Sequence, residues 1–233
     1  MARPSASAVG STVSAASPPE GPPGHRDRPV HTDADGGGLD PRRVRLLVER
    51  HPVVDEREAL SRSIILFELD RLDRPGDEDS GPTHLTASAI VVGDRGVVLH
   101  LHRRLHKWLQ PGGHLEPGEP PERAVIRECV EETGLRVAHP SGGPCLVHVD
   151  VHRAARGHVH LDLRYLVTAP DDDPAPAPGE SQDVAWFSWA EAERLADDAL
   201  AGALQSARRL IGAHGSTAGR GCEETPWPNR STR

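Results

Sequence analysis

The stretch from Gly113 to Leu135 constrains this chain more than any other part of it. A glycine-rich turn leads there into a short segment with closely spaced glutamates. Pro120 and Pro121 stand where prolines favour the start of a helix, and Gly134 stands where a glycine favours its end. The sequence therefore predicts a loop followed by a short helix that ends at Gly134.

The predicted helix has an acidic face. Because a helix turns 100° per residue, Glu128, Glu131 and Glu132 fall within an arc of roughly 100°. Three apolar side chains are expected on the opposite, packing side: Ile126, Cys129 and Val130. Glutamates three and four residues apart repel each other by roughly 0.2 to 0.5 kcal/mol per pair. A cation is therefore expected against this face, and Mg²⁺ prefers such oxygens while bridging to substrate phosphates. The alternative is an ordinary solvated helix face.

The spacing resembles the Nudix box, which runs Gly, five residues, Glu, seven residues, then Arg-Glu-apolar-x-Glu-Glu-x-Gly-apolar. Its fixed positions are filled here by Gly113, Glu119, Arg127, Glu128, Glu131, Glu132, Gly134 and Leu135. Cys129 stands where a larger aliphatic residue is more usual. The resemblance covers about residues 83 to 212. It implies an α/β sandwich, a mixed sheet covered by helices, in which the box forms a loop-helix-loop.

The resemblance also implies a reaction, in which water attacks a phosphorus of a nucleoside diphosphate linked to another moiety. Mg²⁺ or Mn²⁺ is expected on the box oxygens, namely Glu128, Glu131, Glu132 and the Gly113 carbonyl. Arg127 is expected to orient these carboxylates through ion pairs. Glu119 is expected to shape the loop, and Gly134 to end the helix.

The general base is the least constrained role. Glu128 is our first candidate and Glu131 the second, while Asp150 and Asp162 are downstream alternatives. A carboxylate that binds a metal directly is a poor base, which keeps these alternatives open.

Substrate contacts are predicted near the Gly112-Gly113 pair. His114 follows the pair and is expected to contact phosphate, and Trp108 precedes it and is expected to stack on a base or to join the core. Many histidines surround this region, but none has zinc-type spacing, so we expect them to be surface or hydrogen-bonded residues. They are His102, His106, His148, His152, His158 and His160, with His114 as the exception.

The sequence lacks the additional residues, outside the box, that distinguish Nudix subgroups with different substrates. No proline or tyrosine occupies residues 150 to 152, the zone where ADP-ribose hydrolases and dinucleoside polyphosphate hydrolases carry one. Two alternatives to a hydrolase are a nucleotide-sensing Nudix domain and an isoprenoid diphosphate isomerase. The first tends to lose box carboxylates, and the second uses a cysteine and glutamate pair with a modified box. The intact box argues against both.

Composition limits the partners and the setting. The 233-residue chain has a net charge of −8 and a pI near 5.9, so a nucleic-acid polymer is not expected as partner. Its 3 cysteines have no metal-ligand spacing, and we expect a reduced, cytoplasmic setting. We also expect neither a secretory signal nor a membrane span.

The predicted organisation has four parts: a disordered tail (1–38), a helical extension (39–75), the Nudix domain (83–212) and a flexible tail (213–233). In the extension, one helix is expected after Asp40-Pro41. A second is expected after Asp55, with Glu58 closing a capping box and an apolar stripe through Leu60, Ile64 and Phe67. We expect these helices to pack on the main domain; a lid or a homodimer contact are the alternatives.

The predicted strands cover 84–92, 96–101, 146–151, 159–168 and 184–187. A turn at residues 93–96 separates the first two. A final helix is expected to begin at the capping box of Ser188 and Glu191 and to run to Ile211.

Overall fold

The computed structural model describes residues 38–213, so almost all of both predicted tails lies outside the described residues. In chain order the elements are α1 (Pro41–Arg50), α2 (Glu56–Leu69), η1 (Glu78–Ser80), β1 (Thr83–Gly93), β2 (Gly96–His102), β3 (Lys107–Leu109), β4 (Gly112–His114), α3 (Pro121–Thr133), β5 (Cys145–Arg153), η2 (Ala155–Gly157), β6 (Val159–Thr168), β7 (Val184–Phe187), α4 (Trp189–Leu195) and α5 (Asp198–Ala213). The predicted α/β class with a mixed sheet is confirmed. None of the described helices is long and apolar enough to cross a membrane.

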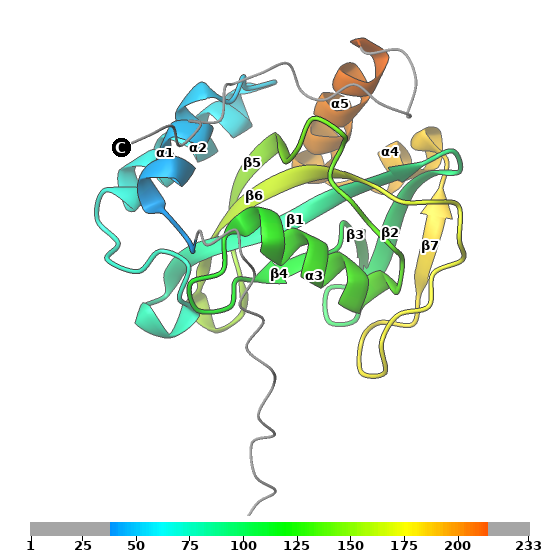
Figure 1. Cartoon of the computed structure of the whole chain (residues 1–233), viewed down its shortest axis with the longest axis horizontal. Helices are drawn as coiled ribbons and strands as arrows, with labels where there is room; N and C mark the ends of the chain where they lie inside the picture. The colour runs from blue at the N-terminus through cyan, green and yellow to red at the C-terminus, as the bar shows by residue number, and fades with distance from the viewer. Residues whose placement is uncertain (1–37, 214–233) are drawn as a thin grey trace, which may run out of the picture. The chain divides into compact units, whose positions relative to one another are not determined.

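A 7-stranded mixed sheet forms the centre of the molecule (Figure 1). Its main path is β3-β2-β1-β6-β5, with β1 and β6 parallel and the other pairs antiparallel. The long strand β1 has two partners along its other edge. Its first half pairs with β4 at Thr86–Ser88, and its end pairs with β2 at Val91–Gly93. The loop that carries Gly113 is thereby tied to the central strand.

The two faces of the sheet bury different helices. Leu85, Ala87 and Val91 of β1 lie in the core cluster that contains the buried residues of α1, α2 and α3. Ile90 and Val92 lie in the cluster that contains α4 and α5. Figure 1 shows α3 in front of the sheet. Because side chains alternate along a strand, three polar residues of β1 share the face of Ile90, opposite α3: His84, Thr86 and Ser88.

Several predicted boundaries are confirmed by local hydrogen bonds. Asp40 caps α1 by accepting from the Arg42 N–H, with Pro41 at the first helical position. The 93–96 turn joins β1 to β2, with the Cα atoms of Gly93 and Gly96 paired. Ser188 and Glu191 form the reciprocal capping box of α4.

The predicted face of α2 is wrong at Leu60 and Phe67, whereas Ile64 is partly buried against the core. Leu60 and Phe67 are 63% and 58% exposed, and the buried line is Glu58, Ser61, Ile65 and Leu69. Asp55 does cap the helix, but the Glu58 carboxylate does not complete a capping box. It accepts instead from the N–H groups of Val54 (2.7 Å) and Val149 (3.0 Å) and lies 2.7 Å from His51 Nε2. A buried hydrogen-bonding site on β5, far away in the sequence, determines which face of α2 packs.

The single helix predicted from Ser188 to Ile211 is also wrong, because two helices fill this range. The chain leaves the helical conformation at Ala196, where ψ is 139°. Asp197 then accepts from the Leu200 N–H at 3.2 Å, as an N-cap does, and α5 begins at Asp198. The break lets the second helix bury Leu200, Ala203 and Leu204 against the sheet.

Candidate active site

Two adjacent glycines bring the box loop against its neighbours. A side chain at Gly112, whose φ is +151°, would overlap the backbone of Ser88 on β1. A Cβ at Gly113 would lie 2.7 Å from Glu128 Oε2. The strand pairing of β4 therefore requires the first glycine, and the close approach of the Glu128 carboxylate requires the second.

Arg127 links the box loop to the box helix. Its guanidinium donates to the Glu119 carboxylate at 2.8 Å, to Glu128 Oε1 at 2.7 Å and to the His114 carbonyl at 2.8 Å. Glu131 Oε2 lies 3.4 Å from the same group. Burial disfavours the guanidinium charge, but the bonds to Glu119 and Glu128 raise the pKa of Arg127 further above its usual range. The ion pairs predicted for Arg127 are present, and Glu119 also accepts from the Glu116 N–H in the loop.

Glu132 is a partly buried acid without a close ion pair. Its Oε2 accepts from the Gly112 N–H at 2.8 Å, and His100 Nδ1 lies 3.8 Å from Oε1. Burial lowers the pKa of His100 to about 4, so this imidazole is neutral at pH 7. Burial and the nearby acids Glu128, Glu180 and Glu131 raise the pKa of Glu132 to about 8, against the effect of the Gly112 hydrogen bond.

The three box acids differ in exposure. The Glu131 side chain is 43% exposed, whereas those of Glu128 and Glu132 are 15% and 14% exposed. Burial raises the pKa of Glu128 despite its bond to Arg127. Val130, expected on the packing side, is 46% exposed, and the packing line of α3 is Ala124, Val125, Cys129 and Thr133. The helix therefore buries its apolar line and holds two partly buried acids beside the Gly112-Gly113 pair.

The donor set fits a hard divalent cation. Glu128 lies against Gly113, and Glu132 binds the N–H of Gly112, so both carboxylates meet the same two residues of β4. Burial, together with the neighbouring carboxylates, raises the pKa of each and so disfavours its charged form unless a cation is near. Carboxylate and carbonyl oxygens are the ligands that Mg²⁺ and Mn²⁺ prefer.

A family model matches this region. The description of the model is NUDIX domain, and it matches residues 82–209. The chain belongs to the NUDIX domain family. It is 34% identical over 153 residues to a MutT-like protein of Streptomyces ambofaciens, an alignment that covers 61% of this chain and 94% of that protein. The predicted family and the predicted enzyme class of Nudix hydrolase are confirmed.

Two further similarities were found. The chain is 32% identical over 123 residues to an isopentenyl-diphosphate Delta-isomerase of Corynebacterium diphtheriae, covering 49% of this chain and 67% of that protein. It is also similar to the crystal structure of a NUDIX family hydrolase from Clostridium perfringens, with 29% sequence identity and a TM-score of 0.48. That match covers 60% of this chain and 99% of the other.

The downstream acids of this Nudix domain lie in a buried charge network. Arg164 donates to Asp162 at 2.9 Å and to Asp150 at 3.2 Å, and Arg57 donates to Asp150 at 2.7 Å. Burial acts to raise the pKa of both acids, but hydrogen bonds and these positive charges hold the pKa of each below its ordinary value. This environment does not favour either acid as a general base.

The predicted substrate contacts lie in different surroundings. Trp108 on β3 packs edge-on against Phe187, with ring centroids 4.7 Å apart, and joins the core cluster under α4 and α5. This geometry favours the core role. His114 is 43% exposed, and its Nε2 lies 3.3 Å from His160 Nε2. His84, which the sequence analysis did not single out, lies beside both rings.

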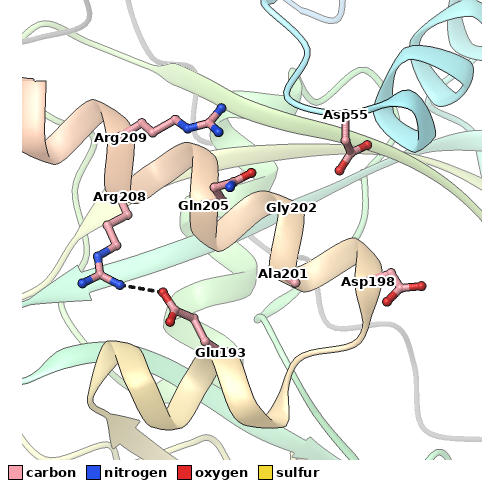
Figure 2. A pocket seen from close by; sticks show the side chains of 8 residues that line it. All are labelled: Asp55, Glu193, Asp198, Ala201, Gly202, Gln205, Arg208 and Arg209. Carbon is pink, nitrogen blue, oxygen red and sulfur yellow. Dashed lines mark hydrogen bonds and ion pairs between the residues drawn. The ribbon is translucent and has the colours of Figure 1, made fainter.

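A cavity of about 710 Å³ lies along α5, away from the box (Figure 2). Its lining mixes both charges, including Asp55, Asp198 and Arg209, and Arg208 is paired with Glu193 at 2.7 Å. No residue of the Nudix box lines it. The chemistry of the box therefore has to take place elsewhere.

Proposed function

We propose that the protein is a Mg²⁺-dependent hydrolase that cleaves the diphosphate bond of a nucleoside diphosphate linked to another moiety. The observation that carries this proposal is the pair of partly buried carboxylates, Glu128 and Glu132, against the Gly112-Gly113 turn. A bound cation stabilises the charged form of two partly buried carboxylates whose pKa values are raised.

The proposed metal-binding groups are the carboxylates of Glu128, Glu131 and Glu132 and the Gly113 carbonyl. When bound, Mg²⁺ would neutralise the diphosphate and lower the pKa of water. Arg127 would fix the positions of the carboxylates through the contacts described above. Glu119 would hold the loop, and Gly134 ends α3 with a left-handed φ of 69°.

The proton of the attacking water needs an acceptor. The water oxygen forms a bond to phosphorus, the bridging oxygen leaves with the electron pair of the broken P–O bond, and a carboxylate takes the water proton. The proposed acceptor is whichever of Glu128 and Glu131 does not bind the ion directly during the attack. Glu131 is the more accessible of the two and has the longer contact to Arg127, 3.4 Å against 2.7 Å.

We expect the partner to be a small nucleotide-type substrate. Contacts from His114 and Trp108 to that substrate, a homodimer and a cytoplasmic location stay predictions.

A panel of substrates tests the proposal. The purified protein is incubated with Mg²⁺ and nucleotide sugars, dinucleoside polyphosphates, ADP-ribose or nucleoside triphosphates, and the products are separated by chromatography. We expect at least one compound to be cleaved at a phosphoanhydride bond, and cleavage to stop when the ion is chelated. Nucleotide binding without turnover would support a sensing domain instead.

Matched variants assign the reaction to the box. Glu131→Gln and Glu132→Gln each replace an ionisable carboxylate with a neutral amide of the same size, and we expect kcat to fall by about 100-fold or more. Glu193→Gln on α4 is the control, because this exposed acid pairs with Arg208 away from the box. Equal turnover by the box variants and the wild type would overturn the assignment.

The similarity to an isopentenyl-diphosphate Delta-isomerase makes isomerisation the second candidate. Such an enzyme uses a cysteine and glutamate pair, and the two cysteines among residues 38–213, Cys129 and Cys145, are both buried. This burial argues against the isomerase. Including isopentenyl diphosphate in the panel separates the two reactions, since an isomerase would convert it without releasing phosphate.

A further inference from the structure

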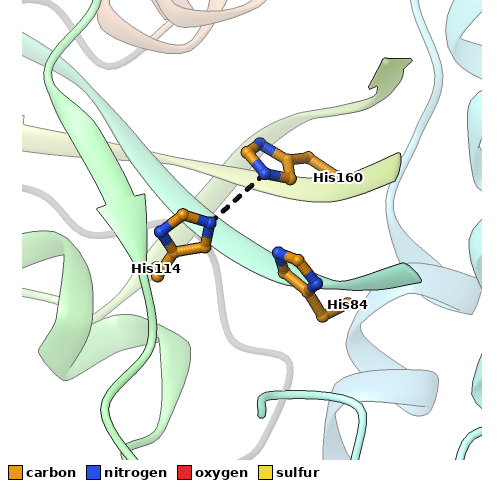
Figure 3. Close-up of side chains that lie close together, drawn as sticks. All are labelled: His84, His114 and His160. Atoms are coloured by element: carbon orange, nitrogen blue, oxygen red, sulfur yellow. Dashed lines mark hydrogen bonds between the residues drawn. The ribbon is translucent and has the colours of Figure 1, made fainter. Parts of the chain in front are cut away.

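Three histidines converge on the face of the sheet opposite α3 (Figure 3). His84 comes from β1, His114 from β4 and His160 from β6. Strand pairing brings them together, because the Cα of His84 is opposite that of His160, and His114 is opposite Thr86, two residues further along β1. One nitrogen from each ring can be chosen so that all three lie within 4.8 Å of one another.

His84 is placed as a metal ligand would be. It is fully buried, and its Nε2 has no hydrogen-bond partner. Its Nδ1 lies 3.4 Å from the Gly81 carbonyl oxygen. Metal-binding histidines commonly donate their second ring nitrogen to such a carbonyl, which leaves the first as a lone-pair donor. A buried ring nitrogen without a partner otherwise costs free energy.

Two of the distances already match those of a tetrahedral ion, and the third ring lies within 4.8 Å. Zinc binds imidazole nitrogen at 2.0 to 2.1 Å, so two tetrahedral ligands are about 3.3 to 3.4 Å apart. The Nε2 atoms of His114 and His160 are 3.3 Å apart, and Glu78 Oε2 is 3.4 Å from His114 Nε2. Glu78 therefore offers a carboxylate oxygen beside His114 that could serve as a fourth ligand. The side chains of His114 and Glu78 would have to shift slightly to bring all four ligand atoms around one ion. Because these side chains are 43% and 50% exposed, they have room to do so.

We propose that His84, His114 and His160, with Glu78 as fourth ligand, form a binding site for a zinc-class transition metal ion. Imidazole ligands favour Zn²⁺ and Co²⁺ over Mg²⁺. The site would join η1, β1, β4 and β6 at one point, and so would fix the residue that follows the Gly112-Gly113 pair. In this arrangement the imidazole of His114 binds an ion, and its predicted contact with phosphate would pass through that ion.

This site is separate from the box acids. His114 pairs with Thr86 and lies on the face of β1 away from α3, whereas Gly113, one residue earlier, faces the Glu128 carboxylate of α3. The backbone of β4 therefore stands between the two donor sets. One set consists of oxygens and the other mostly of nitrogens, so they are expected to select different ions.

A hydrogen bond between two imidazoles is the competing explanation for the 3.3 Å contact. It would satisfy His114 and His160 but would leave Nε2 of the buried His84 without a partner. A bound ion would give a ring nitrogen of each of the three histidines a partner, and it would also explain why the Glu78 carboxylate lies close to His114.

Cobalt titration of the full-length, tag-free protein tests the proposal. The protein is first stripped with a chelator, and Co²⁺ is then added while the visible spectrum is recorded. We expect saturation at one equivalent, with the intense d–d bands of a tetrahedral site, and loss of these bands when Zn²⁺ is added. Absence of such bands in the wild type would overturn the proposal, whatever the behaviour of any variant.

Four variants locate the ion. His114→Ala and His160→Gln remove one proposed ligand each, and we expect the affinity for Co²⁺ to fall by about 100-fold or more. Glu78→Gln should lower it by about 10-fold and change the band positions. His106→Asn is the control, because His106 is exposed and its φ of 50° is tolerated by asparagine.

The box variant Glu132→Gln distinguishes the two sites, because it should keep the cobalt bands while losing Mg²⁺-dependent turnover. Unchanged cobalt affinity in both His114→Ala and His160→Gln would place the ion elsewhere and reject the site.

Discussion

Gly113 is the residue at which a missing side chain matters most for the chemistry. Its backbone is not in a conformation reserved for glycine, so an alanine would be tolerated by the chain itself. The added Cβ would instead lie 2.7 Å from Glu128 Oε2 and push that carboxylate away. We expect Gly113→Ala to lower kcat by about 10-fold or more, with a small change in Tm. Steady-state kinetics and thermal unfolding measure the two effects.

Gly212→Ala is the matched control for this prediction. It lies in α5, where a Cβ would meet no atom within 4 Å. It should keep full activity. An active Gly113→Ala enzyme would show that the Glu128 position is not critical.

At Glu132 the raised pKa predicts how stability depends on pH. Its pKa is about 8 in the folded protein against an ordinary value of 4.5, so between these values the folded state binds the proton and the unfolded state does not. Deprotonation of the unfolded state therefore lowers the free energy of unfolding as pH rises from about 4.5 to 8. Without metal, the wild type should lose stability over this range relative to Glu132→Gln. Urea unfolding in a chelator from pH 5 to 9 measures the difference, and a constant difference would contradict the prediction.

At the scale of elements, α2 is attached to the sheet by a buried polar contact. Glu58 accepts from Val54 and Val149, and its removal would leave both N–H groups without this partner. We expect Glu58→Ala to lower the free energy of unfolding by at least about 2 kcal/mol. Glu56→Ala, an exposed acid two residues earlier on the same helix, should cost less than about 1 kcal/mol. Urea denaturation measures both, and equal effects would reject the special role of Glu58.

The sequence predicts an element well where local signals mark its ends. Asp40-Pro41, the 93–96 turn and the Ser188 capping box are such signals, and each is found where expected. The face of α2 could not be predicted, because it depends on the N–H of Val149 on a distant strand. The histidine cluster was missed for the same reason. His84 and His160 are brought together by the register of β1 and β6, which no local pattern reveals.

At the scale of the whole molecule, the α1–α2 region shares one core with the sheet. Val44, Val48, Ile65 and Leu69 lie in the same cluster as Leu85 of β1. A chain that begins at residue 77 lacks α1 and α2, and with them the apolar side chains that these helices bury in the shared core. We therefore expect this chain to lack cooperative unfolding. A chain that begins at residue 38 keeps every described contact and should unfold like the full-length protein. Urea unfolding followed by circular dichroism compares the two.

The parallel pairing of β1 with β6 has a consequence for synthesis on the ribosome. The central strand, Thr83–Gly93, is made early, but its longest partner, Val159–Thr168, emerges only after β2 to β5. Until then, one edge of β1 exposes backbone groups that could pair with another chain. Non-local pairing of this kind slows folding. The edge of β1 that pairs with β6 therefore stays unpaired until β6 has been synthesised. We expect the nascent chain to be most prone to aggregation during this interval.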